Sequence, residues 1–586
     1  MPAAGASEPS TRITLRFQAP HGASAVRLVM PAWTPGDYRI RRHGRNVRAL
    51  AATDASGAPL PVERRDDSTW EIAAPAGAAV VVRYTLPNSP PDIFTENVKV
   101  TRRYAFYEGH ATFVYVEGLR SAQVELEVGP PPGWSDAITP LEPIEGPDGR
   151  PEPNRFSAHT YDELADSPVL VGECDVRTFS AGGKPHRVAF FGRHRECRPD
   201  TVLPGIRAIV ESQLRWAGGA PYARYVFFVD VGGSGGALEH AASTRIAWAH
   251  TLGPAPLHSL VSHEFFHLWN VKRLRPRHFD PMDLQREVDT RDLWFLEGVT
   301  EYYGRRFLMH SGVWTPRVFA QSMASGIDQL RGNPARLRVT AEESGRRVWE
   351  ANNSEGYGGL SYYLKGMMIG LCLDLFLRHA APGSSGLDDV VRDLLARYGA
   401  PRPGYPEGAI RDAVVRLGGA EAGELLDTMT RTTRELPVGE ALAAAGLRAR
   451  TTRQGTVIEE DPEASEAARA VGEAWLRPAY GGASTAPSRS QRRSSAVSGT
   501  WHAPTASWTR STRVVLNAGT HSAGWCSRYA SATCVGVRPI RSASARARSR
   551  RARFAGVSKR AALRGLSENQ PFAVAEYATT GRPRRA

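Results

Sequence analysis

The chain has 586 residues, of which 41% are hydrophobic and 23% charged. This length excludes a small binding module and gives room for roughly two to four domains, and the composition excludes collagen-like, coiled-coil and wholly disordered proteins. The formal net charge of +14 is unevenly distributed. Residues 477–586 contain 20 basic and 2 acidic residues, a net charge of +18, whereas residues 1–476 contain 54 basic and 58 acidic residues, a net charge of −4. An inference of nucleic-acid binding therefore applies only to the end of the chain.

The sequence predicts neither export nor membrane insertion. Residues 1–16 are polar where a signal peptide would be apolar, and the longest apolar stretch, residues 367–377, is about half a membrane span. The five cysteines are sparse and form no CxxC pair. We therefore expect a cytoplasmic protein with no disulfide framework, no thiolate zinc site and no membrane partner. No sequence feature predicts an oligomeric state.

Residues 1–176 carry short β-branched or alternating runs, among them 14–17, 26–30, 80–86 and 113–116. Segments rich in proline and glycine separate several of these runs. This pattern is typical of strands joined by turns, so we expect an antiparallel β-rich N-terminal domain.

From residue 177 to residue 450 the hydrophobic period changes towards 3.6. The apolar positions predict a first helix around Ile206 and Leu214. They predict further helices near 256–273, 291–308, 360–379, 387–398 and 421–432. Residues 225–229 and 246–248 are expected to form a strand pair around a glycine-rich link. The fold class is therefore α+β and multidomain, with a second domain that is mostly helical towards its C-terminal end.

Residues 451–586 are expected to form a disordered basic tail. After about residue 476 no amphipathic period is sustained, and residues 546–553 form an arginine-rich run. The tail lacks regularly interleaved aromatic residues, so we expect weak nonspecific binding to nucleic acid and no specific recognition. A chain that ends near residue 461 is expected to keep its activity.

The most informative segment is the HExxH motif at residues 263–267 (HEFFH). On a helix, His263 and His267 lie four residues apart on one face and can reach one metal ion, while Glu264 projects beside it towards a bound water. That arrangement is the one zinc hydrolysis requires. The motif by itself does not exclude a helix that holds two histidines by chance.

A catalytic zinc ion needs a third protein ligand. Glu297 lies between an apolar helical stripe and Gly298, and a buried acid in that position is costly unless it is paired or coordinated. We therefore choose Glu297 as the third ligand. Glu301, one turn later, could orient a ligating histidine, but a solvated helix acid is the favoured interpretation.

The segment from Ser262 to Pro276, followed by EGVT at 297–300 and the two tyrosines after it, resembles the glycyl aminopeptidases, family sixty-one of the metallopeptidases and members of the gluzincin clan. Residues 31–41 (PAWTPGDYRIR) are similar to that family's N-terminal motif. Residues 235–240 (GGALEH) are similar to its active-site strand. The resemblance covers roughly residues 10–450.

The resemblance implies a thermolysin-like catalytic domain in which His263, His267 and Glu297 bind Zn²⁺. Glu264 would be the general base that takes a proton from water and passes it to the leaving amine. Tyr363 would donate a hydrogen bond to the tetrahedral oxyanion, although the adjacent Tyr362 is an alternative and either ring could simply be packed.

Glu239 is the predicted specificity residue, because an aminopeptidase must recognise a free α-ammonium group with a carboxylate near the metal. Gly235 and Gly236 would let the backbone approach the substrate closely. The alternative for Glu239 is a surface acid after a strand.

We expect an aminopeptidase that removes Gly or Ala from peptides with a free amino terminus. The alternatives are a zinc endopeptidase or oligopeptidase, and a non-catalytic peptide-binding or basic scaffold protein.

The sequence departs from the family after about residue 450, where its members usually carry a PDZ domain. Neither a carboxylate-binding loop nor a peptide groove is evident here. An out-of-frame or disrupted C-terminus is the favoured interpretation of the basic tail. A genuine disordered tail and a dedicated nucleic-acid module are the alternatives.

Overall fold

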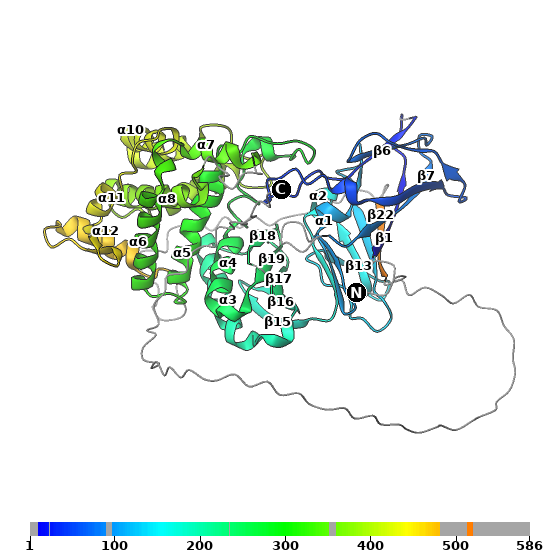
Figure 1. Cartoon of the computed structure of the whole chain (residues 1–586), viewed down its shortest axis with the longest axis horizontal. Coiled ribbons are helices and arrows are strands. Elements are labelled where there is room, and N and C mark those ends of the chain that lie inside the picture. The colour runs from blue at the N-terminus through cyan, green and yellow to red at the C-terminus, as the bar shows by residue number, and fades with distance from the viewer. Residues whose placement is uncertain are drawn as a thin grey trace, which may run out of the picture. The chain divides into compact units, whose positions relative to one another are not determined.

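The computed structural model describes residues 10–22, 24–89, 97–233, 235–350, 359–480 and 512–519. It confirms the predicted fold class, because a β-rich N-terminal part is followed by a mixed part that becomes helical (Figure 1). Among the helices in these ranges, none is long and apolar enough to cross a membrane.

Three sheets build the N-terminal part, with strand orders β12-β13-β11-β22-β1-β7-β3-β4, β10-β2-β6-β5 and β14-β9-β8. Alternate residues of β1, such as Ile13, Leu15 and Phe17, are buried in its core, as the period-two pattern predicts. The strands are β1 (Ser10–Gln18), β2 (Val26–Val29), β3 (Arg48–Asp54), β4 (Pro59–Leu60), β5 (Val62–Arg64), β6 (Thr69–Ile72), β7 (Ala79–Pro87), β8 (Val98–Val100), β9 (Tyr104–Tyr107), β10 (Tyr115–Val116), β11 (Val124–Gly129), β12 (Glu142–Glu145), β13 (Pro151–Ala158), β14 (Val169–Gly172) and β22 (Thr512–Gly519). Two short helices, α1 (Gly109–Thr112) and α2 (Tyr161–Ala165), complete this part.

A five-stranded sheet of order β15-β16-β17-β19-β18 opens the second part. Its strands are β15 (Asp175–Ala181), β16 (Lys184–Gly192), β17 (Tyr225–Val231), β18 (Ala237–Glu239) and β19 (Ser243–Trp248). The predicted strand pair is present as β17 and β19, which run parallel, and the glycine-rich link leads into β18, antiparallel to β19. β15 crosses the predicted domain boundary at residue 176, because it pairs continuously with β16.

Helices form the rest of the second part. They are α3 (Pro199–Ala217), α4 (Pro254–Phe266), the π-helix η5 (Trp294–Val299), α5 (Thr300–His310), α6 (Pro316–Gly332), α7 (Ala341–Arg346), α8 (Tyr362–Ala380), α9 (Leu387–Tyr398), α10 (Ala409–Arg431), α11 (Val438–Ala444) and α12 (Glu466–Leu476). α4 ends earlier than the predicted residue 273, because Leu268 and Trp269 form tight turns back to Phe265 and Phe266. The predicted helix at 291–308 is a π-helix continued by α5.

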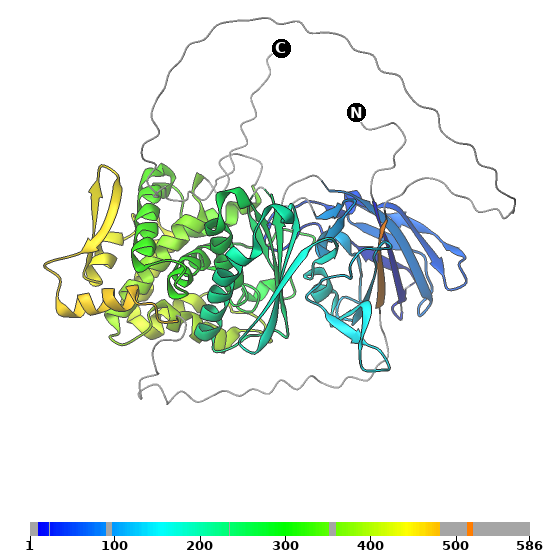
Figure 2. The same ribbon diagram turned by 90° about the horizontal axis from the view of Figure 1, so that it is seen from below.

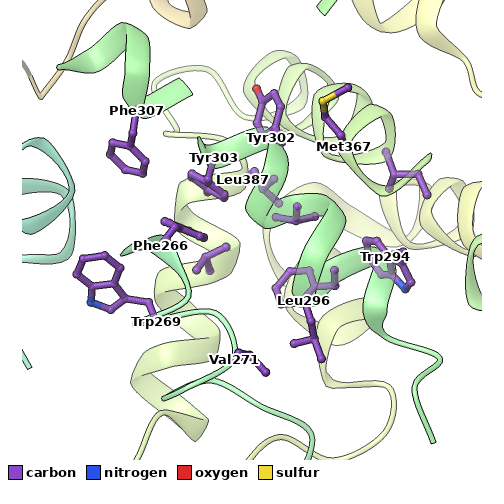
Figure 3. Close-up of a cluster of buried hydrophobic side chains, with 14 of the residues drawn as sticks. Phe266, Trp269, Val271, Trp294, Leu296, Tyr302, Tyr303, Phe307, Met367 and Leu387 are labelled. Atoms are coloured by element: carbon purple, nitrogen blue, oxygen red, sulfur yellow. The ribbon is translucent and has the colours of Figure 1, made fainter. Parts of the chain in front are cut away.

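The interior around α4, α5 and η5 is aromatic, and it fixes how these elements lie against one another (Figure 3). Phe266 at the end of α4 stacks on Tyr303 of α5, with ring centroids 4.4 Å apart and an angle of 13° between the planes. Trp294 and Leu296 of η5 are buried in the same cluster, as is Met367 of α8. The end of the HExxH helix is therefore held by rigid rings from α5.

The predicted disordered tail begins too early. β20 (Leu447–Thr452) and β21 (Gly455–Glu460) form a hairpin, and α12 packs on the helical part. α12 buries Ala468, Gly472 and Trp475, which are spaced four and three residues apart and so lie on one helical face. Trp475 is fully buried, and its indole Nε1 donates to the Tyr302 hydroxyl at 2.8 Å. Residues 481–511 and 520–586 of the predicted tail lie outside the described residues.

β22 also falls within the predicted tail. It lies in the largest N-terminal sheet between β1 and β11, antiparallel to the first and parallel to the second. Both views show it beside β1 (Figures 1 and 2). Val514 of this strand is buried among the core residues of the N-terminal sheets. The prediction failed here because an isolated eight-residue strand has no helical period and its partners lie far away in sequence.

Candidate active site

The HExxH motif lies at the C-terminal end of α4. Pro254 occupies the first turn of this helix after Gly253, where its missing amide hydrogen is not needed. His263 and Glu264 are in the last turn, and His267 follows directly with helical backbone angles. The spacing of four residues therefore brings the two imidazoles together, with ring centroids 4.8 Å apart.

Three side-chain atoms converge at the metal site predicted from the sequence. The Nε2 atoms of His263 and His267 are 3.1 Å apart, and Glu297 Oε2 lies 3.5 Å from the first and 3.2 Å from the second. A tetrahedral zinc ion with bonds of about 2.0 to 2.1 Å holds its ligand atoms roughly 3.3 Å apart. The three residues therefore fit a zinc ion without rearrangement, and all three are buried.

Hydrogen bonds on the far side of each ring fix which nitrogen faces the site. His267 Nδ1 lies 2.7 Å from the carbonyl oxygen of Asn270, which can only accept, so Nδ1 carries the proton. His263 Nδ1 lies 3.0 Å from Glu301 Oε2. Both Nε2 lone pairs therefore point at the same space, which suits a cation between them.

Glu301 is not the solvated helix acid that the sequence favours. Its carboxylate binds His263 on one side and Arg305 on the other, at 2.8 Å. Burial alone would raise the pKa of Glu301, but Arg305 and His263 outweigh it and lower the pKa to about 2. The spacing of four residues from Glu297 is the feature of the sequence that indicates this role.

Glu297 is presented by the π-helix η5, whose wider turn leaves backbone carbonyls that need other donors. Asn270 supplies one: its Nδ2 donates to the carbonyl oxygen of Phe295 at 2.8 Å and to Thr300 Oγ1 at 3.1 Å. Because the Asn270 carbonyl also accepts from His267, one buried residue links the two elements that carry the ligands. Sequence reasoning missed it, since an asparagine in an apolar stretch gives no spacing signal.

η5 and α8 meet through two glycines. A Cβ atom on Gly298 would lie 2.5 Å from Gly366 Cα, and one on Gly366 would lie 2.2 Å from the Trp294 carbonyl oxygen. No side chain fits between these backbones. The contact therefore sets the distance from Glu297 to the first turn of α8, where the two candidate tyrosines lie.

Tyr363 is the tyrosine beside the metal site. Its ring centroid lies 6.0 Å from that of His263, and its side chain is half-buried. Tyr362 is only 2% exposed and stacks on Tyr363 with centroids 4.7 Å apart. The geometry thus assigns the packing role to Tyr362 and leaves Tyr363 as the candidate donor.

Glu239 is not a surface acid. It is 5% exposed, and its carboxylate lies with Glu264 and His267 in a group whose potential ligand atoms are all within 4.8 Å of one another. Burial raises the pKa of Glu264 to about 7, against the opposing effect of the two histidines. Glu239, Glu264 and Glu297 together make this space strongly favourable for cations.

The glycines before Glu239 adopt backbone angles that suit glycine. Gly235 and Gly236 have φ values of +99° and +98°. The Gly236 carbonyl accepts from the Ala247 amide of β19 at 2.9 Å, which anchors the start of β18. These conformations explain the choice of glycine here and are compatible with a close backbone approach to a substrate.

His240 points away from the metal site. Its Nδ1 lies 3.1 Å from Asp166 and its Nε2 lies 3.4 Å from Glu108, both residues of the N-terminal part. Lys272 also binds Asp166, at 3.0 Å. This buried ionic network connects the N-terminal part to the segment directly after Glu239, and it gives His240 a positioning role rather than a metal-binding one.

Comparison with known protein families matches residues 5–173 to the Peptidase M61 N-terminal domain and residues 257–369 to the M61 glycyl aminopeptidase domain. The second match contains the HExxH motif, Glu297 and Tyr363. A comparison with the curated proteins gave no match.

Comparison with solved structures shows a shared fold in one case. An aminopeptidase N family protein from Idiomarina loihiensis superposes with a TM-score of 0.69 at 25% identity, covering 76% of this chain and 77% of that protein. An M1 zinc metallopeptidase from Deinococcus radiodurans gives a TM-score of 0.47 at 15% identity, covering 74% of this chain and 92% of that one.

Proposed function

Because the chain belongs to the M61 glycyl aminopeptidase family and is a peptidase, we propose that it is a zinc-dependent aminopeptidase that removes Gly or Ala from the amino terminus of peptides. The observation that carries this proposal is the juxtaposition of two groups. His263, His267 and Glu297 form a three-ligand cluster, and the buried carboxylate of Glu239 lies within 4.8 Å of His267. A metal and an ammonium group can therefore be held side by side.

His263, His267 and Glu297 hold the zinc ion in this proposal. When bound, zinc supplies Lewis acidity, which makes water acidic enough to act as a nucleophile near neutral pH. Glu264, next to the ligands on α4, accepts the proton of the attacking water and delivers it to the leaving amine. Its pKa of about 7 suits a group that must both accept and release a proton.

Tyr363 is proposed to donate its phenolic hydrogen to the oxyanion of the tetrahedral intermediate. Its position against His263 supports this role. A donor of this kind commonly contributes about 3 kcal/mol to transition-state stabilisation.

Glu239 is proposed to bind the α-ammonium group of the substrate, with the backbone at Gly235 and Gly236 passing close to the first residue. The pairing fixes which peptide bond reaches the metal, because only the bond one residue from the ammonium group then lies over His263 and His267. The preference for Gly or Ala rests on the family to which the chain belongs. The expected cytoplasmic location rests on the sparse cysteines of the sequence.

A panel of aminoacyl amides, each free or N-acetylated and each assayed with and without a chelator, tests the proposal. Free Gly and Ala amides should be cleaved, their acetylated forms refused, and all activity should be lost on chelation and restored by zinc. Equal cleavage of the acetylated forms would indicate an endopeptidase instead. Chelator-resistant cleavage would remove zinc from the mechanism.

A further inference from the structure

Residues 31–41, which are similar to a family motif, follow β2 of the N-terminal sheets and enter the core of the second part, here called the catalytic part. Trp33 and Tyr38 are 0% and 2% exposed and belong to the same buried cluster as the catalytic helices. Trp33 Nε1 donates to the carbonyl oxygen of Asp283 at 3.0 Å, and the Ala32 amide donates to that of Leu284 at 2.8 Å. This segment is therefore fixed to the catalytic part.

The tip of the segment touches Glu239. Gly36 has a φ of +98°, and a Cβ atom placed on it would lie 2.7 Å from Glu239 Oε2, 3.1 Å from Oε1 and 2.6 Å from Leu238 Cδ1. Distances below 3.0 Å are essentially never seen for a real Cβ, so a side chain at this position would displace the ends of the Glu239 and Leu238 side chains. The backbone of Gly36 thus lies directly against the carboxylate that is proposed to bind the ammonium group.

The turn that carries Gly36 is braced on both sides. Tyr38 has a φ of +48°, a left-handed conformation that is costly for a bulky residue and is maintained only by strong packing. Its ring lies 5.9 Å from Trp33 and 5.8 Å from Trp349 of the catalytic part. Arg41 closes the turn by binding Asp37 at 2.9 Å. The turn is therefore rigid.

Tyr38 also brings its phenol towards the acids of the site. Burial, together with the charges of Glu297 and Glu239, raises the pKa of Tyr38 well above its usual value. A tyrosine phenol is neutral near pH 7 in any case, so Tyr38 adds no negative charge to a space that already holds several carboxylates.

We propose that residues 35–38, here called the Gly36 turn, form the end wall of the ammonium subsite and so make the enzyme an exopeptidase. Glu239 contacts this wall at Gly36, and its carboxylate lies within 4.8 Å of the potential ligand atoms of Glu264 and His267. A peptide can place its amino terminus there, but a chain that continues beyond that terminus meets the backbone at Gly36. The N-terminal part thus contributes to specificity, a conclusion that rests on the proposed aminopeptidase function.

The test compares Gly36→Ala with Gly57→Ala. Gly57 has a similar φ of +90° but nothing within 4 Å of its Cβ position, so its variant carries the backbone strain without the contact. Kinetics on alanine amide and calorimetric binding of the same compound to the zinc-loaded, inactive Glu264→Gln background are measured for each. Gly36→Ala should raise KM and weaken binding by about tenfold or more, equal to 1.4 kcal/mol. Gly57→Ala should leave both unchanged.

Should Gly36→Ala fail to fold, Asp37→Asn removes the charge that Arg41 binds and loosens the wall without adding bulk. The ratio of free to acetylated turnover should then fall at least about threefold, a change of roughly 0.7 kcal/mol. If the wild type discriminates against acetylated substrates but the Gly36 and Asp37 variants behave like Gly57→Ala, the proposed wall is refuted and the aminopeptidase proposal stands. If the wild type accepts acetylated substrates equally, both the wall and the aminopeptidase proposal are refuted.

Discussion

The proposed site has two ends that are built in different ways. The metal end consists of His263, His267 and Glu297, and the ammonium end consists of Glu239 and the Gly36 turn. The metal end comes from the end of α4, where His263 and His267 follow helical spacing, and from η5, about thirty residues later, which carries Glu297. The ammonium end joins a short edge strand, β18, to a turn from the N-terminal part some two hundred residues earlier. The metal ligands therefore come from two neighbouring segments of the chain. The turn that is proposed to limit which substrates bind comes from a distant segment. Substitutions at the two ends should therefore have different effects on catalysis, zinc binding and substrate recognition.

The largest effect is expected from Glu264→Gln at the metal end. The ligands remain, so zinc should stay bound, but no group carries the proton. Turnover should fall by about 10³- to 10⁴-fold. Metal analysis and kcat are the measurements, and a variant that keeps full activity would exclude Glu264 from catalysis.

Trp475→Ala should destabilise the helices that position the metal end without changing the preference for free over acetylated substrates. Loss of a fully buried tryptophan beneath Tyr302 is expected to reduce the free energy of unfolding by about 4 kcal/mol. A chain ending at residue 461, which lacks α12, should be destabilised at least as much, contrary to the expectation from sequence that it would remain active. Thermal denaturation of both, beside a chain ending at residue 480, tests this. An unchanged Tm for Trp475→Ala would contradict it.

Glu239→Ala should act at the ammonium end alone. Removing one partner of a buried charge pair is expected to reduce kcat/KM on free aminoacyl amides by about a hundredfold, equal to roughly 2.7 kcal/mol. Zinc content should match the wild type. An equal fractional loss on any residual cleavage of acetylated substrates would assign Glu239 to the fold instead.

Acid should weaken the ammonium end through His43, which braces the segment that carries the Gly36 turn by contacting Thr34 at 3.1 Å. Burial, helped by Arg41, lowers the pKa of His43 to about 3. As the pH falls, His43 takes up a proton in the unfolded chain, where its pKa is near 6.5, before it does so in the folded chain. The contribution of His43 to the free energy of unfolding is therefore complete above about pH 6.5 and is lost as the pH falls towards 3. At pH 5 the contribution of His43 should be about 2 kcal/mol below its value at pH 8. Denaturant melts of wild type and His43→Gln should show a steeper pH dependence for the wild type.

The smallest effect is expected from Glu301→Gln. The amide keeps the contact with His263 but loses its charge, so zinc affinity should fall by about tenfold while KM for the substrate is unaffected. Competition with a graded chelator measures this. A changed KM with normal zinc affinity would mean that the two ends are not separable.

The sequence predicted the metal end better than the ammonium end, for a physical reason. His263 and His267 follow helical spacing, and Glu297 is a buried acid that must find a partner, so the chemistry of the metal end can be inferred from neighbouring residues. Asn270 and Gly36 act through backbone carbonyls and close contacts, which leave no pattern in a single sequence. The fold class followed from periodicity, but β22 and the π-helix η5 did not, since both depend on distant partners.

The position of β22 has a consequence for how the protein is made. β1 is synthesised long before its neighbour in the sheet, β22, which is the last strand that the structure describes. Until residue 519 has been synthesised, β1 and β11 each present an open edge, while the catalytic helices, which lie between β11 and β22 in sequence, are already complete. The peptidase core can therefore reach its final form before β22 is made, whereas the N-terminal sheet is completed only afterwards and is the part that gains most from a chaperone.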